Sequence, residues 1–356
     1  MTATPPEDPA PPGGSAPPGG PAPADEPSTP EGALPNRPGA STFTIEGRAA
    51  PGLFVVGWLA TVLGLGAVLV AFLGGAGKGF PIVLLGGLVV LSIGLVAGAG
   101  GQAIERKARG GRQYVGPSPF LVFAAAIPIS SLVGVGIGAV LSIARVPVDG
   151  PVAALASVAI QAAVYVGLIR LLVVDNGALS WADMRISRFS SAAATDLLLG
   201  AGWAVPVIFA TLPVAYLISQ FIPSKPPNLL PPTGDPVGFS MNLLAAVIFA
   251  PIGEEILFRG FSTTAWMRDM GIQRGLLRGA LFFALAHILT ISGSTAGDAL
   301  GQAAAAFLGR LPIAFALGYL FLQRGSIWAS LGLHATFNAI LLIIQEVAFR
   351  SGVGPA

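Results

Sequence analysis

The chain has 356 residues, of which 53% are hydrophobic and only 10% charged, and its mean hydropathy is +0.77. Because a soluble globular domain carries about a quarter charged residues, this composition excludes a soluble protein and indicates a membrane protein. The net charge of +2 gives no reason to expect a nucleic-acid partner, and we expect none. The absence of cysteine excludes disulfides, thiol nucleophiles and thiolate metal sites.

Residues 1–50 differ in composition from the rest of the chain. They hold 13 of the 31 prolines, repeated Gly-Gly and Pro-Pro pairs, and more acidic than basic residues. Such a segment buries too little apolar surface to offset the entropy lost on ordering, so we predict a disordered tail over 1–50. Its first ten residues lack the basic start and apolar core of a signal peptide, so the first apolar run is predicted to be a retained anchor.

From Gly52 onward, apolar runs of roughly 20 residues follow one another with short polar breaks, and each is long enough to cross a hydrocarbon core of about 30 Å. The sequence therefore predicts an all-α, polytopic bundle of about nine transmembrane helices. The seventh run is short and could be only partly embedded. The nine runs are Gly52–Leu73, Phe80–Gly101, Pro119–Ala144, Pro151–Val174, Leu197–Ile222, Phe239–Gly260, Leu276–Ile291, Ala299–Leu322 and Ile327–Phe349.

The positions of Lys and Arg predict the orientation, because cytoplasmic loops carry the excess of these residues. With the N-terminus inside, thirteen of the 19 Lys and Arg fall in inner segments, four fall in outer segments and two lie within the runs. We therefore predict a multi-pass protein of the cell membrane with a cytoplasmic N-terminus. Nine runs then place the C-terminus outside.

Ionisable residues within apolar runs are candidates for function, since a charge near the bilayer centre costs about 2.5 to 3.5 kcal/mol. Three groups occur here, at the inner end of the sixth run, in the seventh run and in the ninth run. Both histidines of the chain are among them. The residues are Glu254, Glu255 and Arg259, then His287, and then His334 with Asn338.

The first group separates into a pair and a single carboxylate. Glu255 and Arg259 are four residues apart on one helix face, so we expect them to form an ion pair. Glu254 has Phe258 at the corresponding position and no such partner. We expect it to face another helix, where an imidazole could receive it, and to suit the role of a general base.

The second and third groups each have a simpler explanation beside a catalytic one. His334 and Asn338 share a helix face and could present N–H donors to one oxyanion, or they could bridge neighbouring helices. Either histidine alone could be a core imidazole bonded to a backbone carbonyl.

Together these groups form a pattern that resembles a known family. In order and separation, they resemble the three motifs of the CPBP intramembrane proteases, which include type II CAAX prenyl endopeptidases and bacteriocin-processing enzymes. The Ser326-Ile-Trp328 segment and the Pro-rich segment 223–236 extend the likeness, which runs from about Leu197 to Phe349. The three motifs are Glu254-Glu255-x-x-x-Arg259, Phe283-x-x-x-His287 and His334-x-x-x-Asn338.

The resemblance implies an intramembrane endopeptidase that hydrolyses a peptide bond in a membrane-associated protein or peptide. It identifies residues 196–350 as a catalytic transmembrane domain and leaves 51–195 as N-terminal transmembrane helices of unassigned role. We expect cleavage in the cytoplasmic half of the bilayer, because the first motif is predicted at the inner end of its helix. By matching position, Glu254 and His287 activate the water, His334 and Asn338 hold the oxyanion, and Glu255 and Arg259 orient the site.

A divalent metal, possibly zinc, is one cofactor consistent with these residues. Catalytic zinc takes three protein ligands and an open position for water, and Glu254, His287 and His334 could supply the ligands. The usual His-Glu-x-x-His helix signature is missing. Metal-dependent and metal-free hydrolysis therefore both stay open.

Other classes of protein are alternatives to a peptidase of this kind. A transporter or proton-coupled carrier could use Glu254 and the two histidines as a relay, but no internal repeat with matching broken helices is visible. A non-catalytic membrane scaffold or immunity protein could keep the same fold. An aspartyl protease is disfavoured because every Asp after Ala50 lies at the edge of a run or in a loop, and a serine protease because Ser294 lies in a loop-like stretch.

Overall fold

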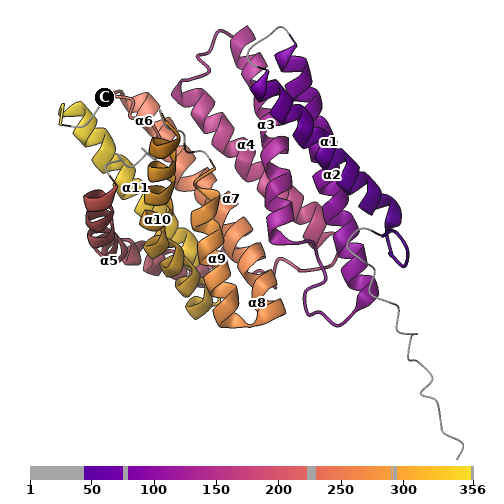
Figure 1. Ribbon diagram of the computed structural model, residues 1–356. Helices are drawn as coiled ribbons and strands as arrows, with labels where there is room; N and C mark the ends of the chain where they lie inside the picture. Colours follow the sequence, from indigo (N-terminus) through magenta and orange to yellow (C-terminus); the bar gives the residue numbers. More distant parts are fainter. Residues whose placement is uncertain (1–43, 75–78, 223–229, 290, 292–294, 354–356) are drawn as a thin grey trace, which may run out of the picture. The chain divides into compact units, whose positions relative to one another are not determined.

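The computed structural model describes residues 44–74, 79–222, 230–289, 291 and 295–353. Most of the predicted tail, residues 223–229 of the Pro-rich segment and Ser294 lie outside the described residues. The segment Ile45–Ala356 packs as one compact unit. Within the described part of the chain every regular element is a helix, so the predicted all-α fold is confirmed (Figure 1). The division at residue 195 stays a prediction.

The first four helices begin with proline in their first turn, where a missing N–H leaves no helical hydrogen bond unmade. The fourth helix continues into a short π-helical segment, η1, at Arg170–Val174. The four helices are α1 (Pro51–Leu73), α2 (Phe80–Arg109), α3 (Pro119–Ile143) and α4 (Pro151–Ile169).

The second half of the chain forms the remaining helices, and side-chain caps fix several of their starts. Ser190, Asp235, Thr295 and Ser326 each accept a hydrogen bond from a backbone N–H of the first turn. The helices are α5 (Ser191–Phe221), α6 (Pro236–Leu243), η2 (Leu244–Phe249), α7 (Ala250–Glu254), η3 (Glu255–Thr263), α8 (Thr264–Met270), α9 (Ile272–Ala286), α10 (Ala296–Arg324) and α11 (Ile327–Arg350).

Eight helices in the described part of the chain are long and apolar enough to cross a membrane. The remaining predicted run, Leu276–Ile291, corresponds to α9, which has 15 residues and is about 22 Å long. That is shorter than a hydrocarbon core of about 30 Å, in line with the partial embedding that its short length suggests.

The sixth helix is longer than its apolar run predicts. The segments α6 to α8 follow one another without a break from Pro236 to Met270, over 35 residues. The predicted end at Gly260 is wrong, because the helix continues through the polar residues that follow. Glu254 therefore lies near the middle of its helix, and the expected depth of cleavage in the cytoplasmic half loses its basis.

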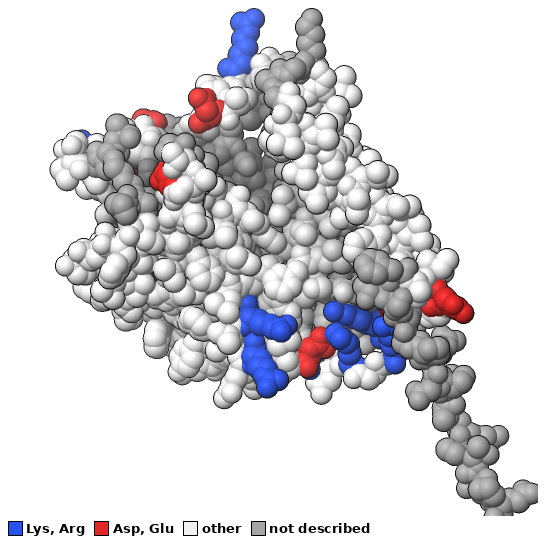
Figure 2. Space-filling view, in the orientation of Figure 1, with Lys and Arg blue, Asp and Glu red and all other residues white. Residues whose placement is uncertain are grey.

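Lys and Arg gather at one end of the bundle, at the bottom of Figure 2. The start of α1 lies there, because the N–H of Ala49 donates to Glu105 at the end of α2 over 2.9 Å. The start of α11 lies there as well, where Trp328 Nε1 donates to Ser187 (3.2 Å to Oγ) beside Arg185. We call this the arginine-rich end, and its residues include Arg48, Arg106, Arg109, Arg112, Arg185 and Arg268.

The buried core is concentrated in the second half of the chain. Aromatic and aliphatic side chains from η3, α9, α10 and α11 fill it, among them Phe258, Phe283, Leu317 and Leu333. The helix α1 buries only Gly57, Gly64 and Ala71, and its large apolar side chains are exposed, as expected for a surface that faces lipid. The core therefore surrounds the helices that carry the three motifs.

Close packing of α5 on α11 positions the helix that carries the third motif. A Cβ atom at Gly200 would overlap the carbonyl oxygen of Ala329, and one at Gly332 would overlap that of Leu197. Small residues let helix backbones approach in this way within a membrane. The backbone of α11 is thus fixed against α5 just before His334.

We predict that Gly200→Ala lowers the free energy of unfolding by about 1 to 3 kcal/mol, because the added methyl group must push the two helices apart. The measurement is thermal unfolding of the purified protein in detergent. Gly202→Ala is the matched control, since no atom lies within 4 Å of a Cβ there. It should stabilise α5 by up to about 1 kcal/mol. Equal effects of the two changes would contradict the proposed close contact.

Candidate active site

The first motif lies where the long helix changes from α-helical to π-helical geometry. Glu254 is the last residue of α7, and Glu255 is the first residue of η3. The hydroxyls of Ser262, Thr263 and Thr264 each donate to the carbonyl five residues earlier, at 2.7, 2.8 and 3.4 Å. Wide π-helical turns of this kind occur often at functional sites, where they redirect side chains.

The predicted ion pair between Glu255 and Arg259 is present. Arg259 Nη1 donates to Glu255 Oε1 over 2.9 Å, and the two side chains are only 2% and 0% exposed. The guanidinium also lies 4.1 Å from the centre of the Phe283 ring and donates to the carbonyl of Ala314 over 3.4 Å. This cation is therefore held from three sides.

His334 lies between the two adjacent carboxylates, a contact that helix spacing does not predict. Its Nδ1 is 2.8 Å from Glu255 Oε1, and its Nε2 is 3.7 Å from Glu254 Oε2. The imidazole is only 5% exposed. Glu255 therefore holds His334 as well as Arg259, so its role is larger than that of a simple partner for the arginine.

His287 approaches Glu254 from the end of α9. Its Nδ1 is 2.7 Å from the carbonyl oxygen of Phe283, which can only accept, so the ring carries its proton on Nδ1. Its Nε2 is 3.6 Å from Glu254 Oε2. The Nε2 side of the ring thus faces the carboxylate of Glu254.

Glu254 Oε2 is the atom on which the two imidazoles converge. It is buried and has no hydrogen-bond partner among the described residues, and both Nε2 atoms lie beyond direct hydrogen-bond distance. If both rings were neutral, with each Nδ1 proton directed to an acceptor, the two Nε2 atoms and Glu254 Oε2 would be three acceptors facing one another. At least one proton must therefore lie among these three atoms, either on an imidazole Nε2 or on a water bound between them.

Asn338 lies on the same side of α11 and is buried. Its Nδ2 donates to the carbonyl of Ala246 in η2 over 2.9 Å. An amide nitrogen has two hydrogens, so one remains for a second acceptor. The structure thus brings both predicted features together, a helix bridge and an N–H donor near His334.

Phe283 is the first residue of the second motif, and its ring contacts three other residues of the site. The motif alone does not indicate these contacts. The centre of the Phe283 ring lies 4.6 Å from that of His287 and 5.7 Å from that of His334, and Arg259 packs on it as well. The spacing of four residues between Phe283 and His287 signals a shared helix face but not these three contacts. An apolar ring here limits the positions that both imidazoles can adopt.

The predicted metal ligands are chemically suitable for a divalent metal. A glutamate and two histidines are a ligand set that zinc accepts, each imidazole having a second partner on Nδ1. Among the described residues, no group of three or more His, Cys, Asp or Glu side chains is placed closely enough to hold a metal ion as it stands. The divalent metal stays a prediction.

Two carboxylates, two imidazoles and an amide thus lie close together among helices that can span a membrane. The family described as type II CAAX prenyl endopeptidase Rce1-like matches residues 236–340, which include all three motifs. The match confirms the resemblance to the CPBP intramembrane proteases and supports a multi-pass membrane protease of the CAAX type. No match is found among curated proteins or among solved structures.

We predict that Arg259→Gln lowers the free energy of unfolding by about 3 to 5 kcal/mol, because it leaves Glu255 buried without its cation. Thermal unfolding in detergent measures the change. The control is Arg170→Gln, which removes a partner 3.9 Å from Asp175 where the arginine is 72% exposed. An exposed pair of this kind contributes about 0 to 1 kcal/mol. Similar losses in the two variants would contradict the stabilising role of the buried pair.

Proposed function

We propose that the protein is an intramembrane endopeptidase that uses Glu254 and His287 to activate water against a peptide bond. This proposal rests on the position of two imidazole Nε2 atoms, which both face the Oε2 atom of Glu254. That oxygen has no hydrogen-bond partner among the described residues. A water at this point donates one hydrogen to Glu254 and the other to His287. Its lone pair is then free to attack.

Attack of the water oxygen forms a bond to the carbonyl carbon, while Glu254 takes the released proton. The negative charge that develops on the carbonyl oxygen faces His334 Nε2 and the second hydrogen of Asn338. Glu254 then gives its proton to the leaving nitrogen as the C–N bond breaks. The products are a carboxylic acid, which keeps the second hydrogen of the water, and an amine, so no cofactor is consumed.

His334 donates from Nε2 in this scheme, and its position between the two carboxylates supports that role. His334 is the imidazole in contact with both carboxylates. With both ring nitrogens protonated, it donates to Glu255 through Nδ1 and to the developing oxyanion through Nε2.

The proposed substrate is a protein or peptide held at the bilayer. The description of the matching family names a prenylated C-terminal motif, so a farnesylated peptide ending in such a motif and its non-prenylated twin are the first probes. Cleavage of the farnesylated peptide alone would assign prenyl proteins as the substrate class. Cleavage of both would assign a wider set of membrane-bound peptides.

We predict that Glu254→Gln abolishes proteolysis while leaving the melting temperature near that of the wild type. Mass spectrometry of membranes from cells that make either form should reveal a full-length species that accumulates only with the variant. With that species as substrate, Asn338→Ala should slow cleavage by about 100- to 1,000-fold, the loss expected for one oxyanion donor. The exposed Glu46→Gln change is the control and should leave the rate unchanged.

Two results would contradict this assignment. Undiminished cleavage by Glu254→Gln would remove Glu254 as the base, and Glu254-dependent uptake of a solute into proteoliposomes without any peptide product would favour a carrier. Elemental analysis of the same preparations tests the divalent metal. A stoichiometric zinc ion that is lost in both Glu254→Gln and His287→Ala would replace the metal-free step by a metal-bound water.

We propose that the N-terminus is cytoplasmic, because positive residues concentrate at the end where α1 begins. Since α11 begins at the same end and runs away from it, the C-terminus belongs on the opposite side. The chain has no cysteine, so single changes can be labelled without background. In intact cells an impermeant maleimide should label Val353→Cys and not Glu46→Cys. The reverse pattern would invert the orientation.

A further inference from the structure

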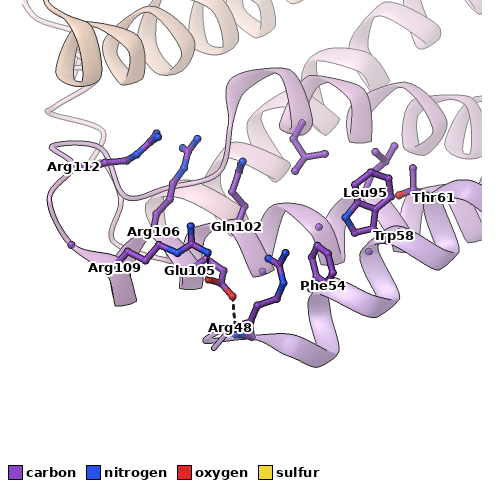
Figure 3. A pocket seen from close by; sticks show the side chains of 17 residues that line it. Arg48, Phe54, Trp58, Thr61, Leu95, Gln102, Glu105, Arg106, Arg109 and Arg112 are labelled. Atoms are coloured by element: carbon purple, nitrogen blue, oxygen red, sulfur yellow. Dashed lines mark hydrogen bonds and ion pairs between the residues drawn. The ribbon is translucent and has the colours of Figure 1, made fainter. Parts of the chain in front are cut away.

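A cavity of about 560 Å³ lies at the arginine-rich end, away from the acid and imidazole site. Helices α1 and α2, the segment that follows α2, and α3 form its walls (Figure 3). Polar and charged side chains line one part, and Phe54, Trp58 and Leu95 line the other. The cavity therefore combines a charged portion with an apolar portion.

The charged portion carries an excess of positive charge. Its lining contains four arginines and the single carboxylate of Glu105. That carboxylate is already engaged, because Oε2 lies 3.2 Å from Arg109 and Oε1 accepts from the N–H of Ala49 over 2.9 Å. The four arginines are Arg48, Arg106, Arg109 and Arg112.

Arg112 and Arg106 differ in their negative partners. Arg112 lies 3.5 Å from Asp269 of α8. Arg106 has no carboxylate within 4 Å among the described residues and donates to the neutral carbonyl of Gly116 over 2.6 Å. An anion bound in the cavity would balance the charge of Arg106.

The apolar portion extends from the arginines along α1 and α2, on the side where Leu121 of α3 completes the wall. Trp58 is half-exposed there, as is common for aromatic residues at a membrane surface, and the guanidinium of Arg48 lies 3.4 Å from the centre of the Phe54 ring. Gly98 borders this portion, and a Cβ atom at that position would meet only Leu121, at 3.8 Å. The helices α1 and α2 are in backbone contact here, since a Cβ atom at Gly57 would lie 2.9 Å from Gly98 Cα. The room for a hydrocarbon chain is therefore beside Gly98, on the side of this pair that faces Leu121 of α3.

We propose that this cavity binds an anionic phospholipid, with its phosphate among the arginines and an acyl chain along the face of α1 and α2 that lies toward Leu121 of α3. Guanidinium groups bind phosphate oxygens through paired hydrogen bonds, and basic pockets between membrane helices select anionic headgroups. A soluble phosphate would leave the apolar portion exposed to water. A bound lipid would instead satisfy both portions at once.

Such a lipid would also connect the two halves of the chain. The segment after α2 contacts the long helix through Arg112 and Asp269, and the ring of Phe120 in α3 lies 5.2 Å from that of Trp266 in α8. The bound headgroup would hold Arg112 in place beside these contacts. The proposal is independent of peptide hydrolysis and concerns binding alone.

The test is native mass spectrometry of the full-length protein in detergent, titrated with phosphatidylglycerol and with phosphatidylcholine of the same acyl chains. We expect retained phosphatidylglycerol and little phosphatidylcholine. The double variant Arg48→Gln/Arg106→Gln should weaken phosphatidylglycerol binding by about fivefold for each arginine. The matched control is Arg145→Gln/Arg350→Gln, which removes two arginines that follow α3 and end α11, away from the cavity.

A second variant tests the same site with Arg106 left in place. Gly98→Leu fills the apolar portion and leaves every arginine in place, so it should also weaken phosphatidylglycerol binding. Equal retention of the two lipids, or equal losses in the cavity and control variants, would overturn the proposal. Displacement of phosphatidylglycerol by millimolar inorganic phosphate, together with unchanged phosphatidylglycerol binding by Gly98→Leu, would also overturn the proposal. The site would then bind free phosphate.

Discussion

The structure depends on one buried cation placed between acidic and aromatic neighbours. Arg259 neutralises Glu255 within a protein interior where an unpaired charge would be costly. Glu255 in turn fixes His334, and the ring that packs on Arg259 also contacts both imidazoles. Arg259, Glu255 and Phe283 thus hold in place the imidazole of His334, which faces Glu254. Two adjacent glutamates therefore have different partners although they differ by only one position in a helix.

The geometry of the backbone makes that arrangement possible. The π-helical turns of η3 begin at Glu255, and three consecutive hydroxyls satisfy carbonyls that such turns leave less well bonded. A second wide segment, η2, presents the carbonyl of Ala246 to Asn338. On the opposite side, glycine contacts fix α11 against α5. The side chains of the site thus meet because three helices are each held at a defined rotation.

Much of this architecture follows from the sequence, because apolar length alone locates helices in a membrane protein. The first four helices begin within one residue of their predicted starts, and the pair Glu255–Arg259 follows from helical spacing. The position of Glu254 along its helix does not, since polar residues beyond Gly260 extend that helix past its apolar run. Contacts between helices, such as that of His334 with Glu255, depend on packing and on π-helical turns, for which the sequence carries no periodic signal.

The short helix α9 affects how open the site is to water. Hydrocarbon contains almost no water, and backbone that leaves helical form at membrane depth must be buried in protein or wetted. The helix ends at His287 after about 22 Å, beside Glu254, and these two side chains are 23% and 17% exposed. The side chains at the end of α9 are therefore partly exposed, whereas the Oε2 atom of Glu254 is buried. A ninth helix continued across the whole bilayer would cover this end of the site.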